Sequence, residues 1–368
     1  YPEKCEIRSY KPTTKGNYVQ VRRVMAALEE AEKPLICIGG GVFAAHAENE
    51  IRELADLMQI PVITTMMGIS VFPDDDQLFC GMIGTHGVKM ANAAVNECDV
   101  LFLVGARVGD RAVKTPLALE KTTKIIHIDI DPAEIGKNIG ADLPLVGDAK
   151  LVLQQMTELA KPMKHDEWIA HIKTLGGERK YVEPAKGTVN PRVFIDRLAK
   201  KMPANVTVVA DVGQNQIWTC TEYKFRKEGR LLTSGGMGTM GYSVPAAIGA
   251  KMADNSRATV AICGDGAFQM SFMELATAVQ FGVDIKVVVM TNNRLGMVRE
   301  LQTNGYHDRQ TAVFLDGSPD FIKLAEAYGI PAMRVYDDDT MEKGVEMLAE
   351  HKGICLVEVV VDKDMPTL

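Results

Sequence analysis

Residues 258–293 read ATVAICGDGAFQMSFMELATAVQFGVDIKVVVMTNN, and this stretch decides the fold. An apolar run ends in the tripeptide GDG, a helical pattern follows, and a second apolar run ends in two asparagines. Strand, helix and strand in this order predict a right-handed βαβ crossover between two parallel strands. Because the carboxyl ends of parallel strands share one edge of the sheet, we expect Asp265 to converge with Asn292 and Asn293.

The residues at this edge suit a metal ion and a phosphate. Carboxylate and carboxamide oxygens are hard ligands for Mg²⁺, which proteins commonly share with a phosphate. The glycines Gly264 and Gly266 allow a sharp turn and a close approach. The backbone N–H groups of Gly266 and Ala267 lead into the next helix, where an anion is favoured. Together these features indicate magnesium and a diphosphate; the alternative is that Asp265 only caps the helix predicted at 268–280.

The alternation of short apolar runs and helical patterns continues on both sides of this stretch. It predicts an α/β fold with two doubly wound, mainly parallel sheets in series. A length of 368 residues also favours two domains. The polar segment 161–190 is the predicted boundary, which gives domains 1–180 and 181–368. The predicted strands are 34–39, 60–65, 99–105, 123–131, 205–213, 258–263, 285–293 and 354–362. The predicted helices are 47–59, 86–98, 191–202, 245–253, 272–281 and 320–329.

Composition excludes several classes of function. A net charge of −7 offers no electrostatic footprint for nucleic acid or an anionic membrane. No apolar run approaches the roughly 20 residues of a membrane span. The seven cysteines are scattered without a C-x-x-C pair, and several lie in apolar runs. This pattern predicts buried free thiols in a reducing cytoplasm rather than disulfides or zinc.

Several motifs carry a resemblance to a known family. The stretch from GDG to the paired asparagines resembles the thiamine diphosphate (ThDP) motif. The stretches DVGQNQIW (211–218), SGGMGTMGYSVPAAIGAK (234–251) and NNRLGMVRE (292–300) are similar to the catalytic subunit of acetolactate (acetohydroxyacid) synthase. In the first half, IGTHGVKMANAAVNECDVLFLVGARVGDRAV (83–113) and IIHIDIDPAEIGKNIGADLPLVGD (125–148) resemble the central, FAD-carrying domain of that family.

In the second half, the resemblance implies residues that would hold ThDP and Mg²⁺. Asp265 and Asn292 would bind Mg²⁺ through side chains, and Arg294 through its carbonyl. Met240 would lie beneath the cofactor and keep it bent, which is a catalytic role; the alternative is a core methionine. The other implied cofactor contacts are Gln214 and Asn215 at the diphosphate, Gly238 and Thr239 at the pyrimidine ring, Gly264, Gly266, Ala267 and Met297.

In the first half, the resemblance implies an FAD site. The run Gly39-Gly40-Gly41 follows a strand, but by itself it is a weak nucleotide signal that a tight turn explains equally well. No acidic residue ends the next strand, which argues against NAD bound in the Rossmann manner. His86 could equally be a polar loop residue, and for Asp131 we favour a turn-forming role. The implied FAD contacts are Gly40, Thr65, Met66, Thr85, His86, Gly105, Arg107, Asp129, Ile130 and Asp148.

Asp110 and Arg111 match a family pair near the substrate channel. The guanidinium fork of Arg111 would meet the carboxylate of a 2-oxoacid, and a surface salt bridge is the alternative. The chain departs from the family at Leu301, where many members have Trp in the pocket for the second 2-oxoacid. It also has Val108 and Gly109 where the family has Phe-Asp, which weakens the FAD assignment.

The resemblance implies a transferase that decarboxylates pyruvate and condenses the hydroxyethyl unit with a second 2-oxoacid, in branched-chain amino-acid biosynthesis. The family's activating glutamate belongs to an N-terminal pyrimidine-binding domain for which no motif occurs here. We therefore expect the chain to be part of a longer protein and inactive by itself. The family also implies a homodimer or tetramer and allows for a regulatory small subunit. The alternatives are a pyruvate oxidase, a 2-oxoacid decarboxylase, or an inactive cofactor-binding module.

Overall fold

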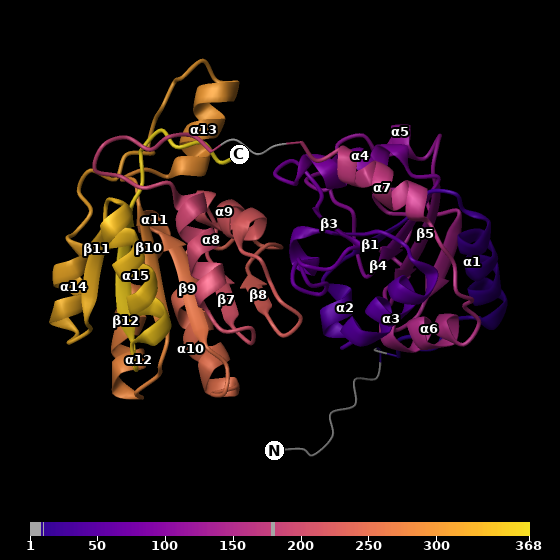
Figure 1. Cartoon of the computed structure of the whole chain (residues 1–368), viewed down its shortest axis with the longest axis horizontal. Coiled ribbons are helices and arrows are strands. Elements are labelled where there is room, and N and C mark those ends of the chain that lie inside the picture. Colours follow the sequence, from indigo (N-terminus) through magenta and orange to yellow (C-terminus); the bar gives the residue numbers. More distant parts are fainter. Residues whose placement is uncertain (1–8, 10, 178–180) are drawn as a thin grey trace. The chain divides into compact units, whose positions relative to one another are not determined.

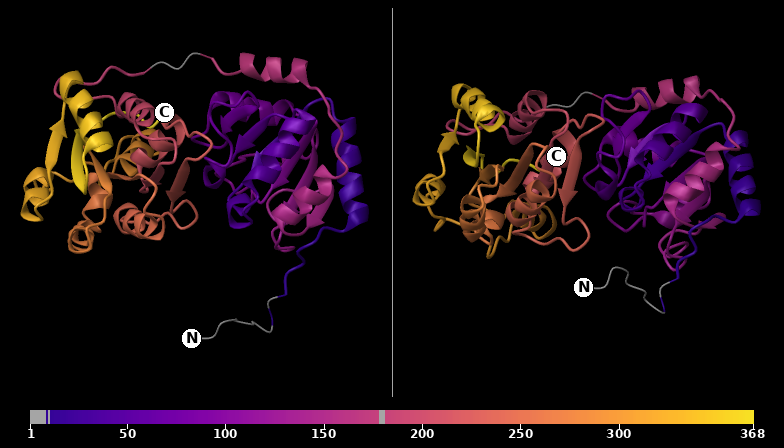
Figure 2. Two further views of the ribbon diagram at one scale, coloured as in Figure 1. Left: turned by 60° about the horizontal axis from the view of Figure 1, so that its bottom comes forward. Right: turned by 90° about the horizontal axis from the view of Figure 1, so that it is seen from below.

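The computed structural model describes residues 9, 11–177 and 181–368, and the chain divides into two compact units. Unit 1 consists of Tyr1–Phe72 and Asp76–Gly177, and unit 2 consists of Pro73–Asp75 and Glu178–Leu368. The sequence predicted a single passage of the chain from the first domain to the second, near residue 180. It gave no sign that Pro73–Asp75 belong with the second unit. Each unit is a parallel sheet with helices on both faces (Figures 1 and 2), which confirms the predicted fold class.

Unit 1 has a six-stranded parallel sheet in the order β3-β2-β1-β4-β5-β6. The strands are β1 (Pro34–Ile38), β2 (Val62–Thr64), β3 (Phe79–Met82), β4 (Val100–Val104), β5 (Lys124–Asp129) and β6 (Leu143–Val146). The helices are α1 (Tyr18–Glu30), α2 (Gly41–Ala44), α3 (Glu48–Met58), η1 (Met66–Gly68), α4 (Lys89–Glu97), α5 (Pro116–Leu119), α6 (Ala149–Thr157) and α7 (Asp166–Thr174).

Two apolar clusters hold unit 1 together, one on each face of its sheet. Alternate residues of β1 point to opposite faces, so Ile36 packs under α1, α3 and α6 while Cys37 packs under α4 and α7. The four residues of α3 that the helical period places on one face, Ile51, Leu54, Ala55 and Met58, are all buried. The central strands are buried on both faces, as a doubly wound sheet requires.

Unit 2 has a second six-stranded parallel sheet, in the order β11-β12-β10-β9-β7-β8. The strands are β7 (Thr207–Ala210), β8 (Arg230–Thr233), β9 (Thr259–Gly264), β10 (Lys286–Thr291), β11 (Ala332–Val335) and β12 (Cys355–Val360). The helices are α8 (Pro191–Lys201), α9 (Gln214–Glu222), α10 (Ser243–Ala253), α11 (Asp265–Phe268), η2 (Phe272–Glu274), α12 (Leu275–Gln280), α13 (Gly296–Gly305), α14 (Phe321–Ala327) and α15 (Asp338–Glu350).

The predicted boundary segment 161–190 contains the end of unit 1, and it also contains a helix that was not predicted, α7, whose Trp168 is buried in unit 1 and donates to the carbonyl of Pro34 at 3.0 Å. The helix predicted at 272–281 is formed by η2 and α12, and a further short helix, α11, begins within the GDG tripeptide. Among the described helices, none is long and apolar enough to cross a membrane.

The described cysteines agree with the prediction of buried free thiols. Burial raises the pKa of Cys37, Cys80, Cys98 and Cys220 to about 12 and that of Cys355 to about 11. The pKa of Cys263 is raised further, first by burial and then by the nearby charge of Asp211. The seventh cysteine, Cys5, lies outside the described residues.

Helix α9 is buried along its whole length although six of its nine residues are polar. Its last residue, Glu222, is 4 % exposed and accepts from Nε and Nη2 of Arg192, on α8, at 2.8 and 2.6 Å. The hydroxyl of Tyr181 donates to the other carboxylate oxygen at 3.1 Å. This buried ion pair ties α8 to α9, and α9 begins at the edge of the sheet where the site lies.

Candidate functional site

The site of unit 2 lies where its strand order reverses. The chain runs from β7 outward to β8 and then crosses back to β9 on the other side of β7. Ligands of open α/β sheets bind at the carboxyl edge of such a switch point. It brings the segment after β7, residues 211–215, beside the turn after β9, residues 264–267. The carboxamide oxygen of Asn215 lies 3.3 Å from the position of a Cβ on Gly264, so the two segments meet closely.

Asp265 converges with the paired asparagines, as the crossover predicted. Strands β9 and β10 are parallel neighbours. The Asp265 carboxylate is 1 % exposed and accepts from the N–H of Gly266 at 2.8 Å, of Asn292 at 3.2 Å and of Asn293 at 2.6 Å. The carboxylate therefore caps the turn after β10, and the alternative that it caps a helix over 268–280 is wrong. Asn293 has φ of 54°, a left-handed conformation that asparagine tolerates.

The donor set fits Mg²⁺. Burial raises the pKa of Asp265 to about 6, and its bound N–H groups only partly oppose that shift. In the described part of the chain no cationic side chain is paired with this carboxylate. Asn292 and Arg294 also line an open pocket of 550 Å³, although Asp265 is not among its lining residues. The described residues include no cluster of three or more His, Cys, Asp or Glu for a metal, so one carboxylate, one carboxamide and a carbonyl would need phosphate oxygens to complete the shell.

The raised pKa of Asp265 predicts how the metal-free protein responds to pH. From about pH 4 to about pH 6 the folded state holds this proton more tightly than the unfolded state does. The free energy of unfolding should therefore fall by about 3 kcal/mol as pH rises through this window. Denaturant titrations of the wild type and Asp265→Asn without metal measure it. The fall must be absent from the variant, and equal slopes in both proteins would contradict the prediction.

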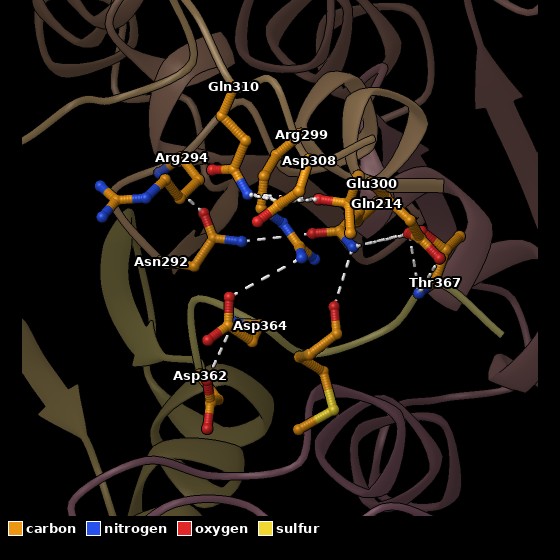
Figure 3. A network of polar contacts seen from close by, with 12 residues as sticks. Gln214, Asn292, Arg294, Arg299, Glu300, Asp308, Gln310, Asp362, Asp364 and Thr367 are labelled. Carbon is orange, nitrogen blue, oxygen red and sulfur yellow. Dashed lines mark hydrogen bonds and ion pairs between the residues drawn. The ribbon is translucent and has the colours of Figure 1, made fainter. Parts of the chain in front are cut away.

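Gln214 and Asn215 do not present free amide donors to a diphosphate. Asn215 donates through Nδ2 to the carbonyls of Asp211 at 2.8 Å and Ile262 at 3.2 Å, and so joins the ends of β7 and β9. Gln214 donates through Nε2 to the carbonyl of Met365 at 2.9 Å and also contacts Glu300 and Thr367 (Figure 3). Its Oε1 accepts from Asn292 at 3.2 Å. In this arrangement the amide NH2 groups of both side chains are held by protein acceptors.

Gly213 precedes α9 in a conformation that only glycine adopts easily, with φ of 144° and ψ of −170°. A Cβ at this position would lie 2.7 Å from the Asn215 carboxamide oxygen. We expect Gly213→Ala to lower the free energy of unfolding by about 2–3 kcal/mol. The matched control is Gly249→Ala, on α10, where a Cβ meets nothing within 4 Å; this change should raise stability by about 0.5–1 kcal/mol. Denaturant midpoints measure both, and a neutral Gly213→Ala would contradict the prediction.

Met240 lies in the loop between β8 and α10 and points at the GDG turn. Its Cε is 3.5 Å from the position of a Cβ on Gly266. The side chain is partly buried and packs against the apolar cluster of unit 2, so a core role and a role beneath a cofactor are both compatible with its place. Gly238 and Thr239 precede it in the same loop and are exposed, and Met297 is half-buried on α13.

The sequence reasoning missed Asp211. This residue follows β7 directly and is fully buried, and its carboxylate accepts from the backbone N–H groups of Gly241 and Ser243. The signal was present in the sequence, because Asp211 ends a buried strand just as Asp265 does.

Unit 1 brings the ten residues expected at FAD to one edge of its sheet. Each follows or ends a strand at its carboxyl end, and together they lie in a row across the edge in the sheet order. From β3 to β6 the row is Thr85 and His86, Thr65 and Met66, Gly40, Gly105 and Arg107, Asp129 and Ile130, and Asp148. The switch point of this sheet lies between β1 and β4, where Gly41 and Gly105 pack so closely that a Cβ on either would be 2.7 Å from the other's Cα.

Two residues of this row, Asp129 and Asp148, also have local structural roles, as does the neighbouring Asp131. Asp148 caps α6 by accepting from the N–H of Leu151 at 3.1 Å. Asp131 accepts from the N–H of Ala133 at 2.9 Å, which agrees with the turn-forming role favoured for it. Asp129 accepts from the N–H of Asp131 at 2.9 Å.

Asp110 and Arg111 lie in the exposed segment after β4. Neither takes part in an ion pair within the ranges that the structure describes, so the salt-bridge alternative is not formed. The Arg111 carbonyl accepts from the N–H of Thr85 at 2.9 Å, which joins this segment to the predicted FAD row. Val108 has φ of 44°, a strained conformation for a β-branched residue. Leu301, on α13, is exposed.

Comparison with known proteins agrees with this division into two units. The C-terminal TPP binding domain of thiamine pyrophosphate enzymes matches residues 211–359, and the central domain of these enzymes matches residues 21–156. A probable acetolactate synthase large subunit of Methanocaldococcus jannaschii is 39% identical over 98% of this chain and 63% of its own length. The acetolactate synthase isozyme 3 large subunit of Escherichia coli is 35% identical over 98% of this chain and 65% of its own length. The chain thus spans less than two thirds of these relatives.

Proposed function

Because the chain belongs to the thiamine pyrophosphate enzymes, we propose that it forms the central and cofactor-binding part of an acetolactate synthase. The substrates would be pyruvate and a second 2-oxoacid. One observation carries the proposal: Asp265 and Asn292 meet on neighbouring parallel strands, inside the segment that matches the TPP binding domain. A carboxylate that is buried without a cationic partner needs a cation, and Mg²⁺ carrying a diphosphate supplies one.

The residues of unit 2 would bind and orient the cofactor. ThDP, when bound, supplies an electron sink for decarboxylation. Asp265, Asn292 and the carbonyl of Arg294 would hold Mg²⁺, and the flexible loop side chain Met240 would support the bent cofactor from below. Gly264 leaves little space between the GDG turn and Asn215, because a Cβ on it would lie 3.3 Å from the Asn215 carboxamide oxygen. Ala267 would offer its N–H to the diphosphate, whereas the N–H of Gly266 already serves Asp265.

Unit 1 would bind FAD along the row of ten residues at its carboxyl edge. The row crosses the switch point, which is where sheets of this kind bind dinucleotides. The proposed reaction involves no net oxidation, so FAD would have a structural role. Arg111 would bind the carboxylate of a 2-oxoacid, a role for which its exposed guanidinium has no competing ion pair among the described residues. We also propose a homo-oligomer, a small regulatory partner and a reducing, cytoplasmic setting, the last because the described thiols are buried and free.

The direct test is a product assay on the protein that carries this chain. With ThDP, Mg²⁺ and pyruvate it should form acetolactate, and added 2-oxobutyrate should divert part of the product. Release of free aldehyde or acetyl phosphate instead of acetolactate would replace the proposal with a decarboxylase or an oxidase. Absorbance of flavin released on denaturation tests the FAD proposal separately.

A further inference from the structure

A second buried carboxylate follows β7, the neighbour of the strand β9 that precedes Asp265. Asp211 follows β7 and is 0 % exposed. Its Oδ1 accepts from the N–H of Val212 at 2.9 Å and of Gly241 at 3.0 Å, and its Oδ2 accepts from the N–H of Ser243 at 2.8 Å. Within the described residues no cationic side chain is paired with it. Burial of an unpaired carboxylate is costly, so these three N–H groups and the N-terminus of α10 must offset that cost.

The carboxylate fixes one end of the loop that carries Met240. The other end is held by Ser234, whose carbonyl accepts from the N–H of Gly238 at 2.7 Å and whose hydroxyl accepts from the N–H of Thr239 at 3.2 Å. Met240 lies between these two anchors and directly precedes Gly241. Gly238 and Thr239 are exposed, so packing of these two residues does little to fix the position of the loop.

The loop faces the GDG turn across the site. The Met240 methyl group lies 3.5 Å from the position of a Cβ on Gly266, and Leu295 and Leu315 border the same position. Asp211 directly follows β7, and β7 pairs with β9, which leads into the turn. Asp211 therefore connects the two walls of the site through one rigid strand, and a shift of its hydrogen bonds would change the gap between Met240 and Gly266.

We propose that Asp211 is a positioning residue: its two oxygens set the distance of the Met240 loop from the GDG turn, and so set the shape in which ThDP is held. The inference rests on the proposed function. It concerns the geometry of the cofactor and not its affinity, because the residues proposed for Mg²⁺ lie on the turns after β9 and β10.

The test is Asp211→Asn, whose carboxamide keeps one acceptor oxygen and turns its NH2 group toward the N–H of either Gly241 or Ser243. In the cofactor-free protein, exchange of at least one of these two amide hydrogens should be at least about tenfold faster. With ThDP and Mg²⁺, affinity should change by less than about threefold, while kcat falls at least about tenfold and KM for pyruvate stays within about threefold. The near-ultraviolet circular dichroism band of the bound cofactor should weaken in parallel. The matched control is Asp337→Asn, which alters a carboxylate that caps α15 away from the site and should leave all five quantities unchanged.

A second variant covers the case in which Asp211→Asn does not fold. Gly241→Ala leaves the carboxylate intact but moves the same loop, because a Cβ there would lie 3.0 Å from the Met270 Cβ at φ of 83°. It should give the same loss of kcat and of the dichroism band. A wild-type band and kcat in whichever variant folds would overturn the inference. Unaltered protein that binds ThDP but makes no acetolactate would overturn only the proposed function, and failure to bind ThDP would overturn both.

Discussion

Asp265→Asn is expected to lower acetolactate formation by the protein that carries this chain at least about 100-fold, because it removes the carboxylate that we propose as a ligand of Mg²⁺. Loss of a residue that merely orients a metal ligand costs about 10- to 100-fold in metal affinity or activity, and loss of the ligand itself should cost no less. Asparagine keeps one acceptor oxygen for the three N–H groups that the carboxylate serves, but its amide group faces donors. The affinity for Mg²⁺ in the presence of ThDP, measured by calorimetry, should fall together with the rate.

The control for this change is Asp284→Asn. Asp284 lies two residues before the start of β10 and forms an ion pair with Lys286. Its replacement therefore alters a charge at the beginning of β10 without changing the turn that follows this strand. Its rate and Mg²⁺ affinity should equal those of the wild type. If Asp265→Asn bound ThDP and Mg²⁺ normally, Asp265 would be a purely structural cap of the turn after β10.

Arg192→Met is expected to lower the free energy of unfolding of unit 2 by about 3–5 kcal/mol, because it removes a guanidinium that donates twice to the buried Glu222 carboxylate. The side chains of Arg192 and Glu222 are only 12% and 4% exposed. Removal of one member of such a pair costs far more than removal of both. We therefore expect Arg192→Met combined with Glu222→Leu to recover most of the lost stability, since two apolar side chains carry no buried charge.

Trp218, on α9, reports the unfolding of unit 2 by fluorescence once Trp168 of unit 1 is replaced by Phe. The matched control is Arg197→Met, which removes a pair on α8 whose partner Asp338 is 81% exposed and which should cost less than about 1 kcal/mol. Equal losses for Arg192→Met and Arg197→Met would contradict the prediction, as would a double variant less stable than Arg192→Met.

The parts of the site that could be predicted are those that depend on short-range order. The crossover from β9 to β10 follows from the alternation of apolar runs, so the meeting of Asp265 with Asn292 could be inferred from sequence. The residues of the row in unit 1 came from the family resemblance, and they lie together because every strand of a parallel sheet ends at the same edge.

The partners of buried polar side chains could not be predicted. Gln214 contacts Met365, a residue 151 positions away, and no local pattern indicates such a contact. Asp211 binds amides 30 and 32 positions later, across a loop whose path depends on left-handed glycines. Helix α7 was not predicted, because only two of its residues, Trp168 and Ile172, are buried and the rest of its surface is polar or exposed.

The burial of the thiols has a practical consequence for measuring how each half of the molecule opens. Cys37, Cys80 and Cys98 belong to unit 1, and Cys220, Cys263 and Cys355 belong to unit 2. A thiol with so high a pKa, enclosed in the core, reacts with an alkylating reagent only while its surroundings are transiently unfolded. Mass spectrometry of the alkylated peptides would therefore measure the opening rate of each unit in one experiment. A ligand that binds to one unit should slow the alkylation of the thiols of that unit alone.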